Sequence, residues 1–301
     1  MTAHAARGRV RASAGKAIAI RRLADPESAR LRLEKAAAYS AYASAYLDPG
    51  LRRFAEFYEA ESGERSALLM HARGGLGPST FLLGDATLMP TLLGLHPGPN
   101  RALLTCEPEH VDEVLSVCHL WHPQVMVRMQ LSRESFVLPA SIAPARRLIA
   151  ADAGDLNRLY ALEGEGIHYS GKQVGQGVYY GADSRGRLVA AAGTHIHSES
   201  QAVAVVGNVF THPDFRGRGL GTAVTAAVSA HLLQTCDLVV LSVDAANRVA
   251  RRLYERLGYR DACRLVEALL TRRGPLSPRP LLRRLVARWR SPTPGVEVVG
   301  G

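Results

Sequence analysis

The nine residues from Phe215 to Ala223 read FRGRGLGTA and place two arginines among three glycines, just before an apolar, helix-like segment. Glycine lets the backbone come close to a ligand, and successive N–H groups followed by the positive end of a helix suit an anion such as pyrophosphate. The arginines would add positive charge at the rim. The residue types and their spacing therefore predict a phosphate-binding loop.

Three kinds of phosphate loop differ in glycine spacing. A Walker loop needs a lysine before its Ser or Thr, which Gly221-Thr222 lacks. A dinucleotide fingerprint needs GxGxxG directly after a strand, whereas this run is GxGxG and follows Thr211-His212-Pro213-Asp214. The pattern RxxGxG is matched by Arg216, Gly219 and Gly221. Considered alone, the glycines would also fit a loop that turns tightly and binds no ligand.

Two segments together are more specific than the glycines. NVFTHPDFRGRGLGTA (208–223) and LSVDAANRVARRLYERLGYR (241–260) fit the order strand, loop, helix, strand, helix. This order and its motifs resemble the GNAT superfamily of acyl-CoA-dependent N-acetyltransferases, over about residues 145–270. The resemblance implies acetyl-CoA as cosubstrate and an amine as acyl acceptor.

The resemblance also implies roles for individual residues. The strand before the loop would present backbone groups to pantetheine, and the loop would hold the pyrophosphate. An asparagine would lie near the pantetheine arm, and a tyrosine beside the thioester sulfur would be the general acid. The matching positions are Val209, Phe210 and Thr211 in the strand, Arg216, Gly217, Arg218, Gly219, Leu220, Gly221 and Thr222 in the loop, then Asn247 and Tyr254. Considered alone, Asn247 also fits a helix cap and Tyr254 a core position.

The general base is less clear, because many members of the superfamily carry an acid on the strand before the loop. Here that strand, 202–207, reads AVAVVG. His195 and His197 alternate on one strand face and are the candidates for the base, with a half-exposed polar face as the alternative. No third ligand is spaced to join them, so we expect no metal. Four other side chains remain open as the base: Glu163, Glu165, His168 and Asp244.

The elements that must position these residues divide the chain at the Pro- and Ala-rich stretch 138–147. Residues 145–270 predict an α/β domain with a mixed central sheet flanked by helices. Residues 36–144 predict a smaller α/β domain, with helices over 39–60 broken at Pro49-Gly50, strands over 66–73, 79–85 and 101–108, and a helix over 110–118. The double arrangement resembles the glycine N-acyltransferase-like branch, in which the front half would be a degenerate copy covering part of the acceptor cleft.

The net charge of +10 resides in the two ends of the chain. A basic arm (1–35) and a basic tail (271–301) each carry +6, which leaves −2 for residues 36–270. We therefore expect no specific nucleic-acid partner. Within the tail, LLRRLVARWR (281–290) predicts an amphipathic helix. Docking on its own domain or on a second subunit, as in a homodimer, is the expectation, and an anionic membrane surface is the alternative.

Four scattered cysteines without a CxxC pair are typical of a reducing cytoplasm, and no apolar run is long enough to span a membrane. The Arg-, Ala- and Ser-bearing start leaves an organellar transit peptide open. We interpret the chain as a cytoplasmic N-acetyltransferase that moves an acetyl or other short acyl group from acyl-CoA to a primary amine of a small molecule or peptide. The alternatives are a non-catalytic acyl-CoA sensor and an interaction protein tethered by its basic ends.

Overall fold

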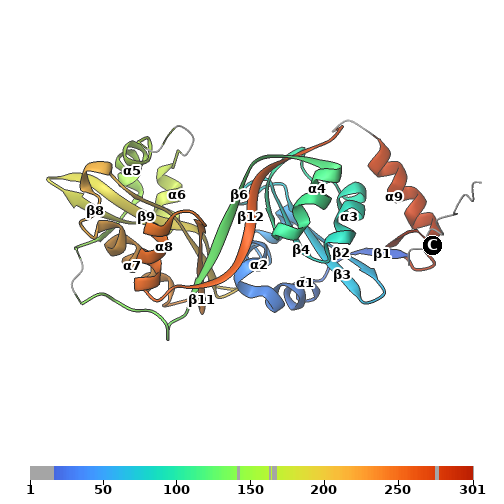
Figure 1. Ribbon diagram of the computed structural model, residues 1–301, viewed down its shortest axis with the longest axis horizontal. Coiled ribbons are helices and arrows are strands. Elements are labelled where there is room, and N and C mark those ends of the chain that lie inside the picture. The colour runs from blue at the N-terminus through green and yellow to red at the C-terminus, as the bar shows by residue number, and fades with distance from the viewer. Residues whose placement is uncertain (1–16, 141–142, 163, 165–167, 275–277, 301) are drawn as a thin grey trace, which may run out of the picture.

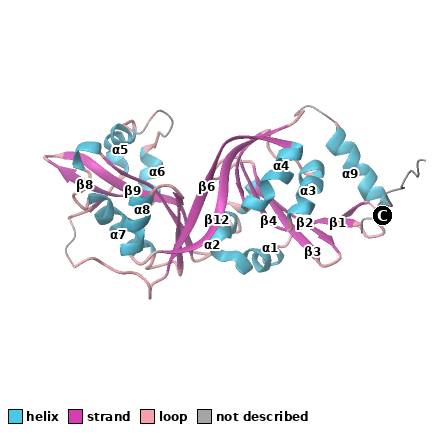
Figure 2. Cartoon of the chain, viewed as in Figure 1, coloured by secondary structure: helices cyan, strands magenta, loops and turns pink. Residues whose placement is uncertain are grey.

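The computed structural model describes residues 17–140, 143–162, 164, 168–274 and 278–300, and these form an elongated molecule built on one mixed β-sheet (Figures 1 and 2). Within these residues the sheet has 13 strands in the order β13-β1-β2-β3-β4-β5-β12-β6-β11-β10-β9-β8-β7. Helices cover its faces. No helix within the described ranges combines the length and apolarity needed to cross a membrane.

The front half and the back half repeat one order of elements, namely a strand, two helices, three strands, a helix, a strand, a helix and a long strand. The front half comprises β1 (Ile18–Arg22), α1 (Pro26–Leu33), α2 (Ala37–Ala45), β2 (Ala55–Ser62), β3 (Arg65–Ala72), β4 (Ser79–Gly84), α3 (Met89–Leu95), β5 (Arg101–Cys106), α4 (Val111–Val117) and β6 (Cys118–Leu131). The back half comprises β7 (Arg146–Arg147), α5 (Ala153–Tyr160), α6 (Gly171–Gln176), β8 (Tyr180–Ser184), β9 (Arg187–Ser198), β10 (Val203–Thr211), α7 (Leu220–Leu232), β11 (Leu238–Asp244), α8 (Arg248–Arg256) and β12 (Arg260–Arg272).

The repeat extends to strand direction. β4 and β5 are parallel and joined through α3, just as β10 and β11 are parallel and joined through α7, while the hairpin strands of each half are antiparallel. A helical crossover is the usual way to join parallel neighbours. The predicted fold class, a mixed α/β sheet preceded by a second half of the same kind, is confirmed.

The two long strands are exchanged between the halves. β6, which ends the front half, pairs with β11 of the back half, and β12, which ends the back half, pairs with β5 of the front half. β6 and β12 also pair with each other along most of their length, in the middle of the molecule (Figure 2). Leu265 on β12 accordingly packs among front-half residues such as Phe57 and Phe81. Each half therefore completes the core of the other.

This exchange predicts that the halves unfold together. Leu265 is fully buried, so Leu265→Ala should lower the free energy of unfolding by about 2–5 kcal/mol, the usual cost of such a truncation in a core. The variant should still show a single thermal transition, with coincident loss of near- and far-ultraviolet circular dichroism. Two separated transitions, only one of them shifted, would contradict the shared core.

Several segments differ from the sequence prediction. The second part of the helical stretch expected over 39–60 is strand β2, whose side chains are largely buried because the strand lies between two others. The basic arm expected over 1–35 is shorter, since β1 and α1 occupy 18–33 and belong to the front half. The tail expected from 271 contributes α9 (Arg279–Arg290) and β13 (Val296–Val299), and β13 pairs with β1.

Candidate active site

The parallel strands β10 and β11 separate halfway along. Their pairing runs from Val203–Leu238 to Val206–Leu241 and stops there, while β11 continues along β6. At the same point β10 bulges away from regular pairing with β9, and Asn208 adopts a left-handed conformation with a φ of 55°. A bulge bends a strand away from its partner. The gap lies beside Val209, Phe210 and Thr211, the residues expected to face pantetheine.

The glycine loop lies between β10 and α7 and has the form of an anion cradle. Gly217 and Gly219 both have a φ of +75°, and a Cβ at either position would meet no atom within 4 Å, so open space lies beside the backbone. Gly219 is the N-cap of α7 and provides no side-chain cap. The N–H groups of Leu220, Gly221 and Thr222 therefore lie at the positive end of a 13-residue helix without a capping side chain. The loop therefore has the geometry of an anion site of the kind that holds a pyrophosphate.

The two loop arginines are exposed at the rim of this cradle. Arg216 donates from Nε to the carbonyl of Thr211 at 3.1 Å and lies over the Phe210 ring. Arg218 donates to the carbonyl of Asp214 at 3.1 Å. These bonds orient both guanidinium groups and leave further N–H donors on each, which suits charge-assisted bonds to phosphate.

Asn247 and Tyr254 lie at the start and near the end of α8. Asn247 is the N-cap and accepts from the N–H of Ala250 at 3.0 Å, so the capping role exists whatever else this side chain does. Tyr254 is 7% exposed and packs edge-on against Tyr259 at a centroid distance of 5.9 Å. Burial raises the pKa of Tyr254 to about 12, which keeps its hydroxyl protonated as a donor.

A cavity of about 660 Å³ lies between the two halves on the β9 side of this gap. His195 faces it from β9. Its ring lies against the backbone of Gly207, where a Cβ would come within 2.3 Å of the ring, so only glycine at 207 lets the histidine approach the point where β10 and β11 part. Tyr42, from α2 of the front half, forms a hydrogen bond with Nδ1 of His195. The imidazole is thus held between the halves.

Short side chains bring α2 this close to the back half. Ala41 and Ala45 of α2 are fully buried and pack with Ile196, Val205 and Val240 of β9, β10 and β11. Alanine lets a helix approach a sheet closely because it has only a Cβ. This contact places Tyr42 at the cavity. The helical pattern of residues around Tyr42 gave no indication of this position.

The surroundings of His195 favour its neutral form. Desolvation lowers the pKa of His195 most strongly, while a hydrogen bond with Asn208 and the negative charge of Glu267 oppose this and Arg128 adds to it. Arg128 is fully buried on β6, has its guanidinium 5.4 Å from the centre of the Tyr42 ring, and has no hydrogen-bond partner among the described residues. A neutral imidazole at neutral pH can accept a proton.

Glu267, on the exchanged strand β12, is the functional candidate that sequence reasoning missed. Its carboxylate lines the cavity and accepts from the Ser242 hydroxyl at 3.1 Å, and Ser242 directly follows the last β11 residue paired with β10. Among the described lining residues it is the one acidic side chain, and none is Lys or Arg. The sequence did contain a signal, because Glu267 is the single acid in the mostly apolar segment CRLVEALL.

The remaining candidates lie elsewhere or outside the described residues. His197 also lines the cavity, but it pairs with Ala204, before the strands separate, and is hydrogen-bonded to Thr235 at 2.9 Å. His168 and Asp244 are exposed, and neither lines this cavity. Glu163 and Glu165 lie outside the described residues. Among those described, no three His, Cys, Asp or Glu side chains form a metal-binding group.

The front half has no equivalent cradle. Its loop between β4 and α3 carries Asp85, whose carboxylate accepts from the N–H of Thr87 and would repel an anion. Between the ends of β4 and β5, the fully buried His110 donates from Nε2 to the carbonyl of Gly84 at 2.7 Å and accepts at Nδ1 from the N–H of Glu107. The His110 side chain thus connects the end of β4 with the segment that follows β5.

Comparison with known proteins agrees with this geometry. Residues 179–267 match the family model described as FR47-like protein. Mycothiol acetyltransferases of Thermobispora bispora and Salinispora tropica are 41% identical over 86 residues and 40% identical over 88, or 27% and 28% of this chain. The chain spans only 29% and 28% of the length of these relatives. A solved Drosophila melanogaster structure is 18% identical and has a TM-score of 0.59 over 84% of this chain and 98% of its own.

The structural comparison shows that the fold extends across both halves, and the family match over residues 179–267 includes the gap, the loop, His195 and Glu267. The back half of this chain, which holds the gap and the loop, belongs to the GNAT superfamily of acetyltransferases.

Proposed function

We propose that this protein transfers an acetyl or other short acyl group from acyl-CoA to a primary amine. The observation that carries the proposal is that His195 and Glu267 face one cavity beside the point where β10 and β11 separate, next to a loop suited to pyrophosphate. Acetyl-CoA supplies an acyl thioester when bound. An amine bound in the cavity would then lie between the proton acceptors and the gap.

The lining of the cavity supports an amine as the acceptor. Glu267 would attract the ammonium form, and the neutral His195 would accept the proton that the amine loses before attack. Tyr42 would hold the imidazole in position through Nδ1. The other lining groups include the rings of Tyr46, Tyr169 and Tyr179 and the amides of Gln173 and Gln176. They suit a small, polar acceptor.

Tyr254 would act on the opposite side of the reaction. Its hydroxyl stays protonated at neutral pH and would donate to the departing sulfur of CoA. Backbone N–H groups in the unpaired part of β10, around Val209 and Phe210, would polarise the thioester carbonyl. Most of the rate acceleration would come from holding the two reactants together.

Binding of the acyl donor is tested by thermal stability. Acetyl-CoA at about a hundred times its dissociation constant should add about 2.7 kcal/mol to the free energy of unfolding. Gly219→Val should abolish this shift, because a side chain there fills the space beside the loop backbone. Gly186→Val is the matched control, since Gly186 has a φ of +73° and an equally open position, but lies in the β8–β9 turn. An undiminished shift in Gly219→Val would contradict the cradle.

The acceptor is tested by release of free CoA thiol across primary amines, with the acceptor used by mycothiol acetyltransferases among them because two relatives carry that name. Thiol release that depends on the amine supports the transferase. Tight binding of acetyl-CoA without thiol release from any amine would instead support an acyl-CoA sensor.

A further inference from the structure

The C-terminal helix α9 packs on the front half through its charged side. Arg284 and Arg288 donate from Nε to one carboxylate oxygen of Glu297 at 3.3 and 3.1 Å. The other oxygen of Glu297 lies 2.8 Å from Nε2 of His96, and both of these side chains are buried. This network fixes the rotation of α9 about its axis.

With its arginines turned inward, α9 turns its apolar side outward. Its one buried residue is Ala287. Five large apolar side chains, which we call the α9 strip, are between 49% and 87% exposed: Leu281, Leu282, Leu285, Val286 and Trp289. A surface helix normally buries such a face, so the α9 strip is oriented for contact with something outside this chain. The expectation that the apolar side docks on its own domain is wrong for these five side chains.

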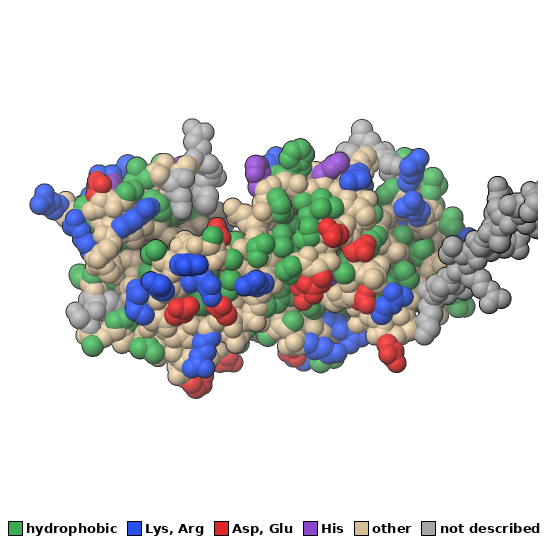
Figure 3. Space-filling model, viewed as in Figure 1, with side chains coloured by type: hydrophobic (Ala, Val, Ile, Leu, Met, Phe, Trp, Pro, Cys, Tyr) green, Lys and Arg blue, Asp and Glu red, His purple; other side chains and the backbone are tan. Residues whose placement is uncertain are grey.

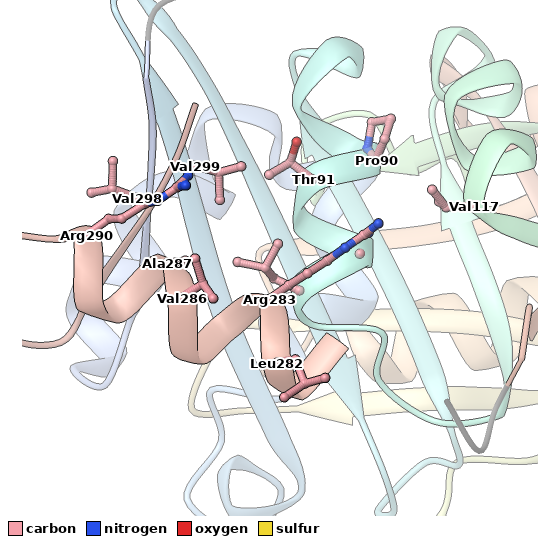
Figure 4. Close-up of a pocket in the computed structure, with 12 residues that line it drawn as sticks. Pro90, Thr91, Val117, Leu282, Arg283, Val286, Ala287, Arg290, Val298 and Val299 are labelled. Carbon is pink, nitrogen blue, oxygen red and sulfur yellow. The ribbon is translucent and has the colours of Figure 1, made fainter. Parts of the chain in front are cut away.

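An apolar groove continues the α9 strip. A hollow of about 530 Å³ lies between α9, α3 and β13, and Leu282 and Val286 belong both to the strip and to its wall (Figure 4). The side chains of Arg283 and Arg290, also on α9, line the same hollow. Figure 3 shows basic and hydrophobic side chains side by side at this end of the molecule. The surface therefore combines apolar area with positive charge.

The segment that contains α9 and β13 is strongly basic. Within residues 271–301, seven arginines accompany a single acid, Glu297, which the network above already uses. Ile18 of β1 pairs with Val299 of β13, so the chain before β1 joins the fold at this same end. Residues 1–16 contain four Lys or Arg and no Asp or Glu. Arg283 and Arg290, which line the hollow beside the α9 strip, complement a dense array of negative charge.

We propose that the α9 strip docks on a membrane surface that contains anionic lipids. A helix of 12 residues is too short to span a bilayer but can lie in the interface, with its apolar side among the acyl chains and basic side chains at the headgroups. A second copy of the chain is the less suitable partner, because two strips in contact would bring Arg283 and Arg290 of both copies together. Anionic headgroups neutralise them instead.

The test uses the full chain and vesicles of phosphatidylcholine with or without phosphatidylglycerol. With Trp121→Phe, Trp289 is the only tryptophan, and its emission should shift to the blue with anionic vesicles alone. Leu282→Gln with Leu285→Gln should weaken vesicle binding by about tenfold or more, since each buried leucine contributes strongly. Leu31→Gln is the matched control, because Leu31 is 49% exposed on α1.

Charge is tested in the same assay. Arg283→Ser should weaken binding and Arg187→Ser, at the exposed start of β9, should not, while about 0.5 M NaCl should weaken the wild-type interaction through screening. Equal binding to neutral vesicles, or no binding, would overturn the proposal. A concentration-dependent dimer that the double leucine variant abolishes would also overturn the proposal, because it would show that the α9 strip binds a second copy of the chain.

Discussion

Turnover should fall by about 10²–10⁴ in Tyr254→Phe, the usual effect of losing a general acid, while the affinity for acetyl-CoA stays close to that of the wild type. The substitution removes one oxygen and keeps the ring that packs against Tyr259. Because the pKa of Tyr254 is raised to about 12, its hydroxyl is available as a proton donor at any working pH. Steady-state turnover with a good acceptor, beside acetyl-CoA binding in the same variant, measures the effect.

Tyr259→Phe is the matched control for this prediction. Tyr259 is 1% exposed, and its hydroxyl is hydrogen-bonded to the Ser229 hydroxyl at 2.8 Å, away from the proposed chemistry. Its loss should lower the free energy of unfolding by about 0.5–1.5 kcal/mol and leave turnover unchanged. If Tyr254→Phe behaves in the same way, Tyr254 is a core residue and the donor lies elsewhere.

His195→Gln should also lower turnover by about 10²–10⁴, because it removes the proposed general base. Glu267→Gln should have a smaller effect and should move the acid limb of the pH–rate profile. The Glu267 carboxylate raises the pKa of His195, so its removal lowers that pKa and the base stays deprotonated to lower pH. The acid limb should therefore shift toward lower pH, which a pH series of kcat/KM measures.

Two comparisons separate these roles. His197→Gln, two residues along the same strand, should retain turnover because His197 is bound to Thr235 and lies away from the gap. Abolished turnover in Glu267→Gln, together with nearly normal turnover in His195→Gln, would reverse the assignment and make the carboxylate the base.

The conformation of the glycine loop could be predicted from sequence because its determinants are local. RxxGxG, the strand before it and the α7 pattern after it all lie between Val203 and Leu232, and α7 forms over Leu220–Leu232 as expected. The residue types alone indicate these conformations. Glycine is the usual residue at positive φ, as at Gly217 and Gly219, and asparagine is a common helix cap, as at Asn247.

The proposed acceptor cavity could not be predicted because its residues meet only through tertiary contacts. Tyr42 comes from a front-half helix and Glu267 from a strand exchanged between the halves, and neither has a neighbouring motif. The strand β2 was mistaken for helix because it is buried on both faces and therefore lacks the alternation of a half-exposed strand. Strand pairing between distant segments leaves no local pattern.

The exchanged strands also constrain how the chain folds while it is being synthesised. β5 acquires its neighbour β12 only after nearly the whole back half has been synthesised, and β1 acquires β13 only after β12 and α9 have also been made. Until then the nascent front half presents a hydrogen-bonding edge to other chains, and pairing across such sequence separations is intrinsically slow. The architecture that joins both halves into one sheet therefore leaves a strand edge unpaired during synthesis for longer than an unexchanged pair of domains would.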